Sequence, residues 1–63
     1  MKEFWLARDR DYDLFIYEKE PLKNEHTGDW ILGGRFERLP ELLFPEIRWE
    51  DKKPTKCIIE FTK

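Results

Sequence analysis

Two short apolar runs near the N-terminus constrain the fold of this chain more than any other feature. They are EFWLAR at residues 3–8 and DLFIYEK at residues 13–19, and the polar stretch DRDY lies between them. Aromatic and β-branched runs on either side of a short polar stretch are typical of a β-hairpin. The length of the hairpin loop stays open, and the register of the two strands depends on it.

Both faces of this hairpin are apolar whichever register applies. A three-residue loop places Phe4, Leu6, Leu14 and Ile16 on one face and Trp5, Ala7, Phe15 and Tyr17 on the other, whereas a loop of two or four residues exchanges the faces of the second strand. A strand pair with one solvated face should alternate apolar and polar residues instead. We therefore expect the hairpin to be covered on both faces or to present one face to a partner. The candidate interaction face consists of Trp5, Phe15 and Tyr17.

The rest of the chain predicts a single small domain over residues 1–63. Pro21 ends the second strand because proline cannot donate to a ladder. Residues 22–28 form a polar loop and residues 29–32 a strand; Gly33-Gly34 forms a bulge or turn, and residues 35–38 continue that strand. Residues 56–61 form the last strand. We expect a complete, mostly β protein with an antiparallel sheet of about four strands and one short helical turn packed across it.

The helical turn is predicted within LPELLFPEIRWED, residues 39–51, where large apolar residues lie between two prolines. Pro40 suits the first position of a helix, and Pro45 pushes the residue before it out of helical geometry. Three leucines fall at the i, i+3 and i+4 positions of one helical face. Burial and chain entropy nearly cancel in so small a domain, so nearly every large apolar side chain is needed inside. The predicted structural plug of the core consists of Leu39, Leu42, Leu43, Phe44 and Trp49.

This plug hypothesis has a direct test in two truncations. A buried leucine contributes enough stability that Leu42→Ala or Leu43→Ala should unfold much of the population. If both variants melt like the parent protein, the plug hypothesis is wrong. The stretch then becomes the first place to look for function.

The composition argues against several classes of protein. Charged residues make up 41% of the chain, their signs alternate and the formal net charge is −2. That mixture is neither the basic footprint of a nucleic-acid binder nor an acidic mimic of DNA. The chain has no apolar run long enough to span a membrane and no signal-peptide pattern. With one cysteine and no metal-type Cys/His spacing, we expect a cytoplasmic protein without a disulfide, metal or cofactor.

Residues that could carry catalysis are scarce. The chain has no serine, His26 lies in a polar loop, and Cys57 lies in an apolar strand pattern where a thiol is inert. Asp9, Asp11, Asp13 and Glu20 match the carboxylate positions of an EF-hand loop, but Leu14 stands where that loop needs glycine. Aspartate is also a common turn residue. We therefore predict a hairpin turn in DRDYD rather than a calcium site in residues 9–20, and no enzymatic activity.

Most of the chain resembles a group of short proteins from gut-dwelling anaerobic bacteria and their prophage-like elements. The likeness rests on FWLARD, then DLFIYEKEP, and above all on RLPELLFPEIRWED at residues 38–51. That group carries no assigned activity, cofactor or catalytic residue. The resemblance therefore implies a bacterial or phage setting and transfers no site residue.

The doubly apolar hairpin and the missing catalytic residues favour a protein-interaction module. We expect it to act through a sheet face or an edge strand, with another protein or with itself as a weak homodimer. The alternative is single-stranded nucleic-acid binding by stacking on the aromatic face, although no positive groove accompanies that face. A metal-assisted enzyme or a calcium site at residues 9–20 is the least favoured hypothesis.

Overall fold

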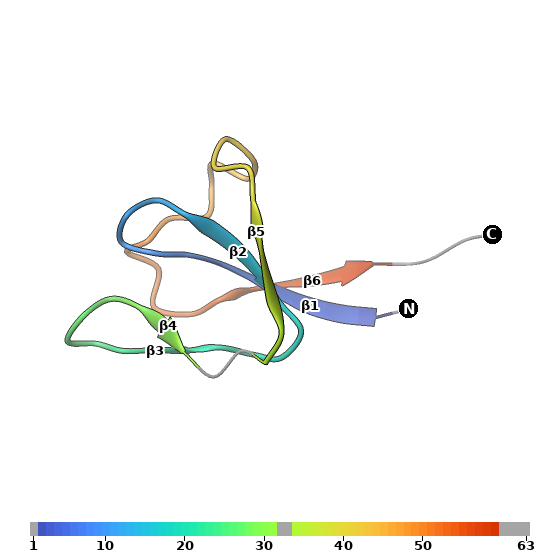
Figure 1. The fold of residues 1–63 in the computed structure, drawn as a ribbon, viewed down its shortest axis with the longest axis horizontal. Helices are drawn as coiled ribbons and strands as arrows, with labels where there is room; N and C mark the ends of the chain where they lie inside the picture. The colour runs from blue at the N-terminus through green and yellow to red at the C-terminus, as the bar shows by residue number, and fades with distance from the viewer. Residues whose placement is uncertain (1, 32–33, 60–63) are drawn as a thin grey trace.

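The fold consists of two antiparallel sheets (Figure 1). The computed structural model describes residues 2–31 and 34–59. The larger sheet has the order β5 (Phe36–Leu39), β2 (Leu14–Tyr17), β1 (Lys2–Arg8) and β6 (Thr55–Ile59), and the smaller one pairs β3 (Leu22–Lys23) with β4 (Trp30–Ile31). The prediction of a mostly β chain with a four-stranded antiparallel sheet is confirmed.

The predicted hairpin is the centre of the larger sheet. Arg8 lies opposite Leu14, and the Asp9 amide donates to the Asp13 carbonyl at 2.8 Å. Residues 10–12 are therefore the loop, which selects the three-residue register from the two that the sequence left open. The Tyr12 amide closes the turn on the Asp9 carbonyl at 2.9 Å, and Tyr12 has a φ of 73°. A turn followed by one left-handed residue is the usual solution for a three-residue hairpin loop.

Each face of the sheet carries its own apolar cluster, and both are covered. One face packs Leu6 and Leu14 under Ile47 from the segment between β5 and β6, with Ile16, Leu39 and Cys57 around them. The other packs Ala7 and Tyr17 against Trp30 of β4, with Trp5 and Phe15 at the margin. The Trp30 indole N–H donates to the Arg8 carbonyl at 2.9 Å and ties the small sheet to β1. Of the two expectations for the hairpin, a cover on both faces or one face presented to a partner, the structure shows a packed cluster on each face.

The segment after β5 contains turns in place of the predicted helical turn. The amides of Leu43, Ile47 and Asp51 each donate to the carbonyl three residues earlier, which produces three successive single turns. Phe44 adopts a φ of 52°, which a right-handed helix does not allow. Pro45 follows at once, so the first turn cannot continue into a helix.

Residues 30–38 also differ from the prediction of one interrupted strand. Trp30–Ile31 pairs with β3 in the small sheet, whereas Phe36–Leu39 pairs with β2 in the large one. Trp30 packs in the aromatic cluster with Ala7 and Tyr17. The last strand is described as Thr55–Ile59, and the predicted positions Leu32, Gly33, Glu60 and Phe61 lie outside the described residues.

Candidate interaction surface

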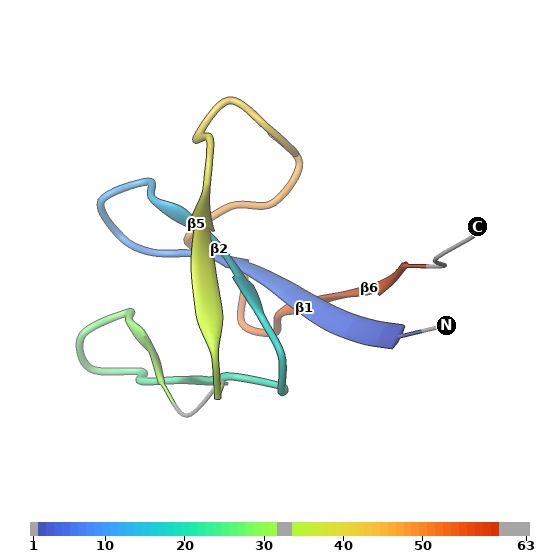
Figure 2. The ribbon, with the colours of Figure 1, turned by 45° about the vertical axis from the view of Figure 1, so that its right-hand side comes forward.

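A buried arginine organises the end of the molecule where the β1–β2 loop meets the segment after β5 (Figure 2). Arg8 is the last residue of β1 and only 5% exposed. Its guanidinium has five N–H groups, and each donates to a different backbone carbonyl. The acceptors and donor–acceptor distances are Ile47 at 2.7 Å, Tyr12 at 2.8 Å, Leu43 at 2.9 Å, Glu41 at 3.0 Å and Phe44 at 3.3 Å.

These hydrogen bonds fix the backbone of two loops but leave their apolar side chains outside. Leu42 is 88% exposed, Tyr12 60%, Leu43 44% and Phe44 42%. We call these four residues the loop-end surface. Because one guanidinium binds the carbonyls of Tyr12, Leu43 and Phe44, their backbones lie within a few ångströms of each other. Adjacent exposed apolar side chains on a fixed backbone are typical of a binding surface.

The exposure of Leu42, Leu43 and Phe44 shows that the plug hypothesis is wrong for these residues. Leu39 does pack against the core cluster, and Trp49 is half-buried at a separate pocket. The side chain that fills the core from this segment is Ile47, at 3% exposure. The prediction failed because it assumed a helical spacing, whereas consecutive single turns bring a different residue inward.

Two aromatic residues of this end adopt backbone conformations that favour glycine. Tyr12 and Phe44 are the non-glycine residues with positive φ in the described chain. The left-handed conformation costs a residue with a Cβ atom about 1–2 kcal/mol. Glycine at either position would relieve that strain but would remove an exposed ring. The hairpin loop accounts for this conformation at Tyr12, and the end of the first turn before Pro45 accounts for it at Phe44.

A groove of about 460 Å³ borders the loop-end surface. Tyr12, Leu42, Pro45 and Ile47 contribute its apolar walls. Its remaining lining is Arg8, Asp11, Glu41, Arg48 and Glu50. The N–H groups of Arg8 donate to backbone carbonyls, and Arg48 forms an ion pair with Glu50 at 2.8 Å. Donation to neutral carbonyls does not remove the charge of Arg8, so the lining as a whole holds three carboxylates against two guanidinium groups and carries a net charge of −1.

The interaction face predicted from the sequence is brought together on one side of the large sheet. Trp5 lies opposite Tyr17, and Tyr17 lies opposite Phe36 of β5, so three aromatic residues cross three strands. The Phe15 and Phe36 rings meet edge to face, with centroids 5.6 Å apart. However, Tyr17 is only 5% exposed, and Trp5 and Phe15 are half-buried. Most of this face is core, and Phe36 at 59% is its exposed part.

Burial of Tyr17 predicts a loss of stability at high pH. Desolvation, with smaller contributions from Asp9 and Asp29, raises the pKa of Tyr17 to about 12. The folded protein therefore holds the phenol proton more tightly than the unfolded chain, whose tyrosines titrate near pH 10. This stabilisation is complete below pH 10 and disappears as pH rises through about 12. We expect unfolding free energy to fall by about 2 kcal/mol over that interval.

Urea unfolding of the parent and of Tyr17→Phe at pH 9 and pH 12 measures this effect. The phenylalanine variant keeps the ring and reports the deprotonation of all other groups. Its free energy of unfolding should fall less than that of the parent. Equal losses in the two proteins would contradict the assignment to Tyr17.

The three carboxylates of the predicted DRDYD turn differ in what they do in the hairpin. Asp13 pairs with Arg38 at 3.2 Å, and Asp11 accepts the Asp13 amide at 3.3 Å. Burial raises the pKa of Asp9, as do Asp11, Asp29 and Asp13, while the backbone N–H of Trp30 lowers it. Asp9 Oδ1 is buried without a hydrogen-bond partner among the described residues. The pKa of Asp9 is thus higher in the folded protein than in the unfolded chain. Protonated Asp9 favours the folded state at low pH, whereas its ionised form opposes folding at neutral pH.

The other residues singled out in the sequence lie apart from the loop-end surface. His26 is exposed in the β3–β4 turn, where its amide donates to Asn24 Oδ1 at 2.9 Å. Cys57 is a half-buried free thiol against the core cluster. Within residues 2–31 and 34–59, no group of three His, Cys, Asp or Glu side chains is arranged to hold a metal ion.

Sequence reasoning missed the central role of Arg8. The signal was available, because the two-residue strand period places Arg8 on the same face as Leu6 and Phe4. An arginine on a core face needs internal hydrogen-bond acceptors. Turn carbonyls are such acceptors, but the sequence does not indicate which segment supplies them.

The comparisons with known proteins found no relative of this chain. The chain matches no protein-family model, no curated protein and no solved structure. In the part of the chain that the structure describes, no helix has the length and apolar character needed to cross a membrane.

Proposed function

We propose that this chain is a non-enzymatic protein-interaction module whose binding site is the loop-end surface. The observation that carries the proposal is the set of hydrogen bonds made by the Arg8 guanidinium. Its five N–H groups bind the carbonyls of three residues of this surface and of two residues near them in the chain. A fixed backbone lowers the entropy lost when a partner binds. The loop end is favoured over the sheet face, because Tyr17 is buried, Trp5 and Phe15 are half-buried, and Phe36 is the exposed part of that face.

The charge around the loop-end surface selects the class of partner. Asp11 and Glu41 line the groove, and Glu46 is exposed beside it. A second copy of the chain would bring together two grooves of the same net negative charge, and like charges oppose that contact. The favoured partner is therefore a protein segment that combines apolar residues with lysine or arginine. A homodimer through this surface is the less favoured occupant.

Single-stranded nucleic acid on the aromatic face is the alternative function, and local ion pairs weigh against it. Lys56 and Arg38 share the sheet face with Trp5 and Phe15, as their cross-strand partners. Lys56 is paired with Glu3 at 3.0 Å, and Arg38 with Asp13 at 3.2 Å. Stacking platforms for single strands rely on unpaired positive charge, so the partners we propose are proteins.

Selection from a random peptide display library tests the proposed function. We expect enriched peptides to place leucine or an aromatic residue beside lysine or arginine. The substitution Leu42→Asp should weaken their binding about tenfold or more, because it removes an apolar anchor and adds a rim charge. Leu22→Asp is the matched control, since Leu22 is 55% exposed but lies on β3. Enrichment of acidic peptides, or equal binding to both variants, would contradict the proposal.

A further inference from the structure

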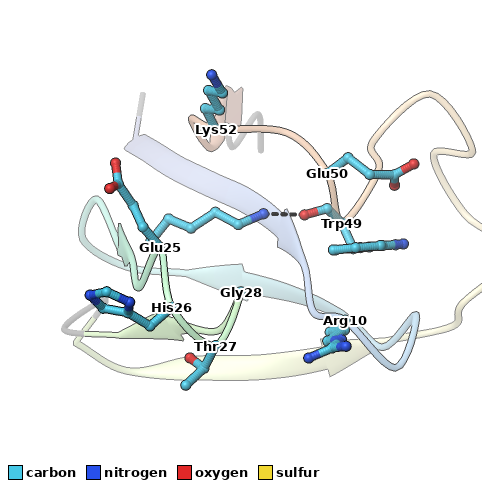
Figure 3. A pocket seen from close by; sticks show the side chains of 9 residues that line it. Arg10, Glu25, His26, Thr27, Gly28, Trp49, Glu50 and Lys52 are labelled. Carbon is cyan, nitrogen blue, oxygen red and sulfur yellow. Dashed lines mark hydrogen bonds between the residues drawn. The ribbon is translucent and has the colours of Figure 1, made fainter.

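A second concave site lies between the β3–β4 turn and the turn at residues 48–51 (Figure 3). This open pocket has a volume of about 630 Å³, within the range of small-molecule sites in proteins. Its lining comprises Arg10, Lys23, Glu25, His26, Thr27, Gly28, Trp49, Glu50 and Lys52. Figure 3 shows Trp49 and Arg10 at one end and His26 at the other.

Lys23 makes this pocket a preformed one. Its Nζ donates to the carbonyl of Trp49 and, at 2.9 Å, to that of Asp51. The same ammonium lies 5.1 Å from the ring centre of buried Trp30 and 5.8 Å from that of Trp49. One lysine on β3 thus ties the turn at residues 48–51 to the small sheet. Both walls of the pocket are thus held in place without a ligand, and the half-buried Trp49 belongs to one of them.

Opposite Trp49, the wall of the pocket is bare backbone. Gly28 has a φ of 80°, and a Cβ atom placed there would lie 4.0 Å from Cζ3 of Trp49. Gly28 therefore lies close to the edge of the indole, and its positive φ favours glycine at this position. No large side chain projects from residue 28 toward the Trp49 ring.

The lining of the pocket carries a net positive charge, whereas the whole chain carries a net negative charge. Its lining carries the cations Arg10, Lys23 and Lys52 against the carboxylates of Glu25 and Glu50. Glu50 is neutralised by Arg48, which lies outside the lining, at 2.8 Å. The pocket is thus locally positive on a chain whose net charge is −2. Arg10 is exposed and lies at the same end as Trp49, so its guanidinium is placed for an anionic group near the indole.

We infer that this pocket binds a planar aromatic ring that carries an anionic group, the chemistry of a nucleotide. The ring stacks on Trp49, and the anionic group contacts Arg10, whose planar guanidinium suits phosphate and carboxylate geometry. A base stacked on an aromatic side chain contributes enough affinity that its loss is measurable. The same chemistry occurs in a free nucleotide and at the end of a single strand.

Titration with AMP, followed by tryptophan fluorescence and by amide NMR, tests the inference. We expect saturable quenching and shifts confined to residues 26–28 and 49–52. Trp49→Leu and Arg10→Ala should each weaken AMP binding about tenfold, and Trp49→Phe should retain most of it, because the smaller ring still stacks. Lys53→Ala removes an exposed charge that does not line the pocket and should leave affinity unchanged. NMR dispersion of each variant verifies that it is folded.

Controls with partial ligands separate the two halves of the site. Adenosine and inorganic phosphate should each bind at least tenfold more weakly than AMP, because each lacks one contact. Equal affinity for adenosine and AMP, no saturable AMP binding, or shifts outside the pocket would overturn the inference. Tighter binding of a hexameric oligoadenylate than of AMP would support the site and assign it to strand ends. Leu42→Asp should leave AMP affinity unchanged, so this site and the loop-end surface fail or succeed separately.

Discussion

Replacement of Arg8 by alanine is expected to unfold most of the protein at 25 °C. The change removes five hydrogen bonds to backbone carbonyls, with donor–acceptor distances from 2.7 to 3.3 Å, and leaves a cavity under the two loops. Hydrogen bonds from a charged donor contribute about 1.5–3 kcal/mol each, so the loss is several kcal/mol even if water replaces part of them. A domain of this size has a total stability of about 3–9 kcal/mol.

Urea unfolding followed by circular dichroism measures the Arg8 effect. Arg10→Ala is the matched control, since Arg10 belongs to the same hairpin but is exposed, and its midpoint should stay within experimental error of the parent. Arg8→Lys should fall between them, because an ammonium keeps the charge and only three donors. An Arg8→Ala protein with the parental midpoint would show that the hydrogen bonds of Arg8 do not hold the fold together.

Two leucine truncations are expected to lower the free energy of unfolding by very different amounts. Leu14 is fully buried at the centre of the core face, and a buried leucine cut to alanine typically costs 2–5 kcal/mol. Leu42 is 88% exposed and makes no part of either core cluster, so Leu42→Ala should change stability by less than about 0.5 kcal/mol. The chemistry of the two changes is identical, and only burial differs.

Thermal melts of the two variants, with NMR dispersion as a second readout, distinguish these outcomes. Leu14→Ala should lose dispersed signals at a temperature where Leu42→Ala keeps them. Substantial destabilisation by Leu42→Ala would restore the plug hypothesis and would remove Leu42 from the loop-end surface. It would also change the peptide-binding test, because a folding defect would then account for lost affinity.

Several features could be predicted from the sequence because they depend on local physical rules. Alternating apolar residues around DRDY predicted the β1–β2 hairpin, and the apolar character of both faces predicted a cover on each side. The carboxylate-rich loop predicted a turn, which the Asp9–Asp13 pairing confirms. Strand periodicity and turn chemistry are set within a few residues, so a sequence window contains the information they need.

The loop-end surface could not be predicted in the same way, because it depends on contacts distant in sequence. The Arg8 guanidinium binds Ile47, which is 39 residues away, and Leu43, which is 35 residues away. A helical spacing of Leu39, Leu42 and Leu43 was the local rule for that stretch, and it placed Leu42 inside. The turns of this segment instead place carbonyls around buried Arg8, and an unpaired buried guanidinium would be far more costly than an exposed leucine.

By itself, the sequence determined the β class, the central hairpin, the doubly apolar character of that hairpin and the scarcity of catalytic residues. The tertiary structure decided the register, the assignment of Trp30 and Phe36 to different sheets, and the choice of Ile47 as the core residue of its segment. It also decided which apolar residues are exposed. The physical reason is the range of the interactions: periodicity and turn preferences act between neighbours, whereas the hydrogen bonds of Arg8 and Lys23 join turns whose proximity exists only in the folded chain.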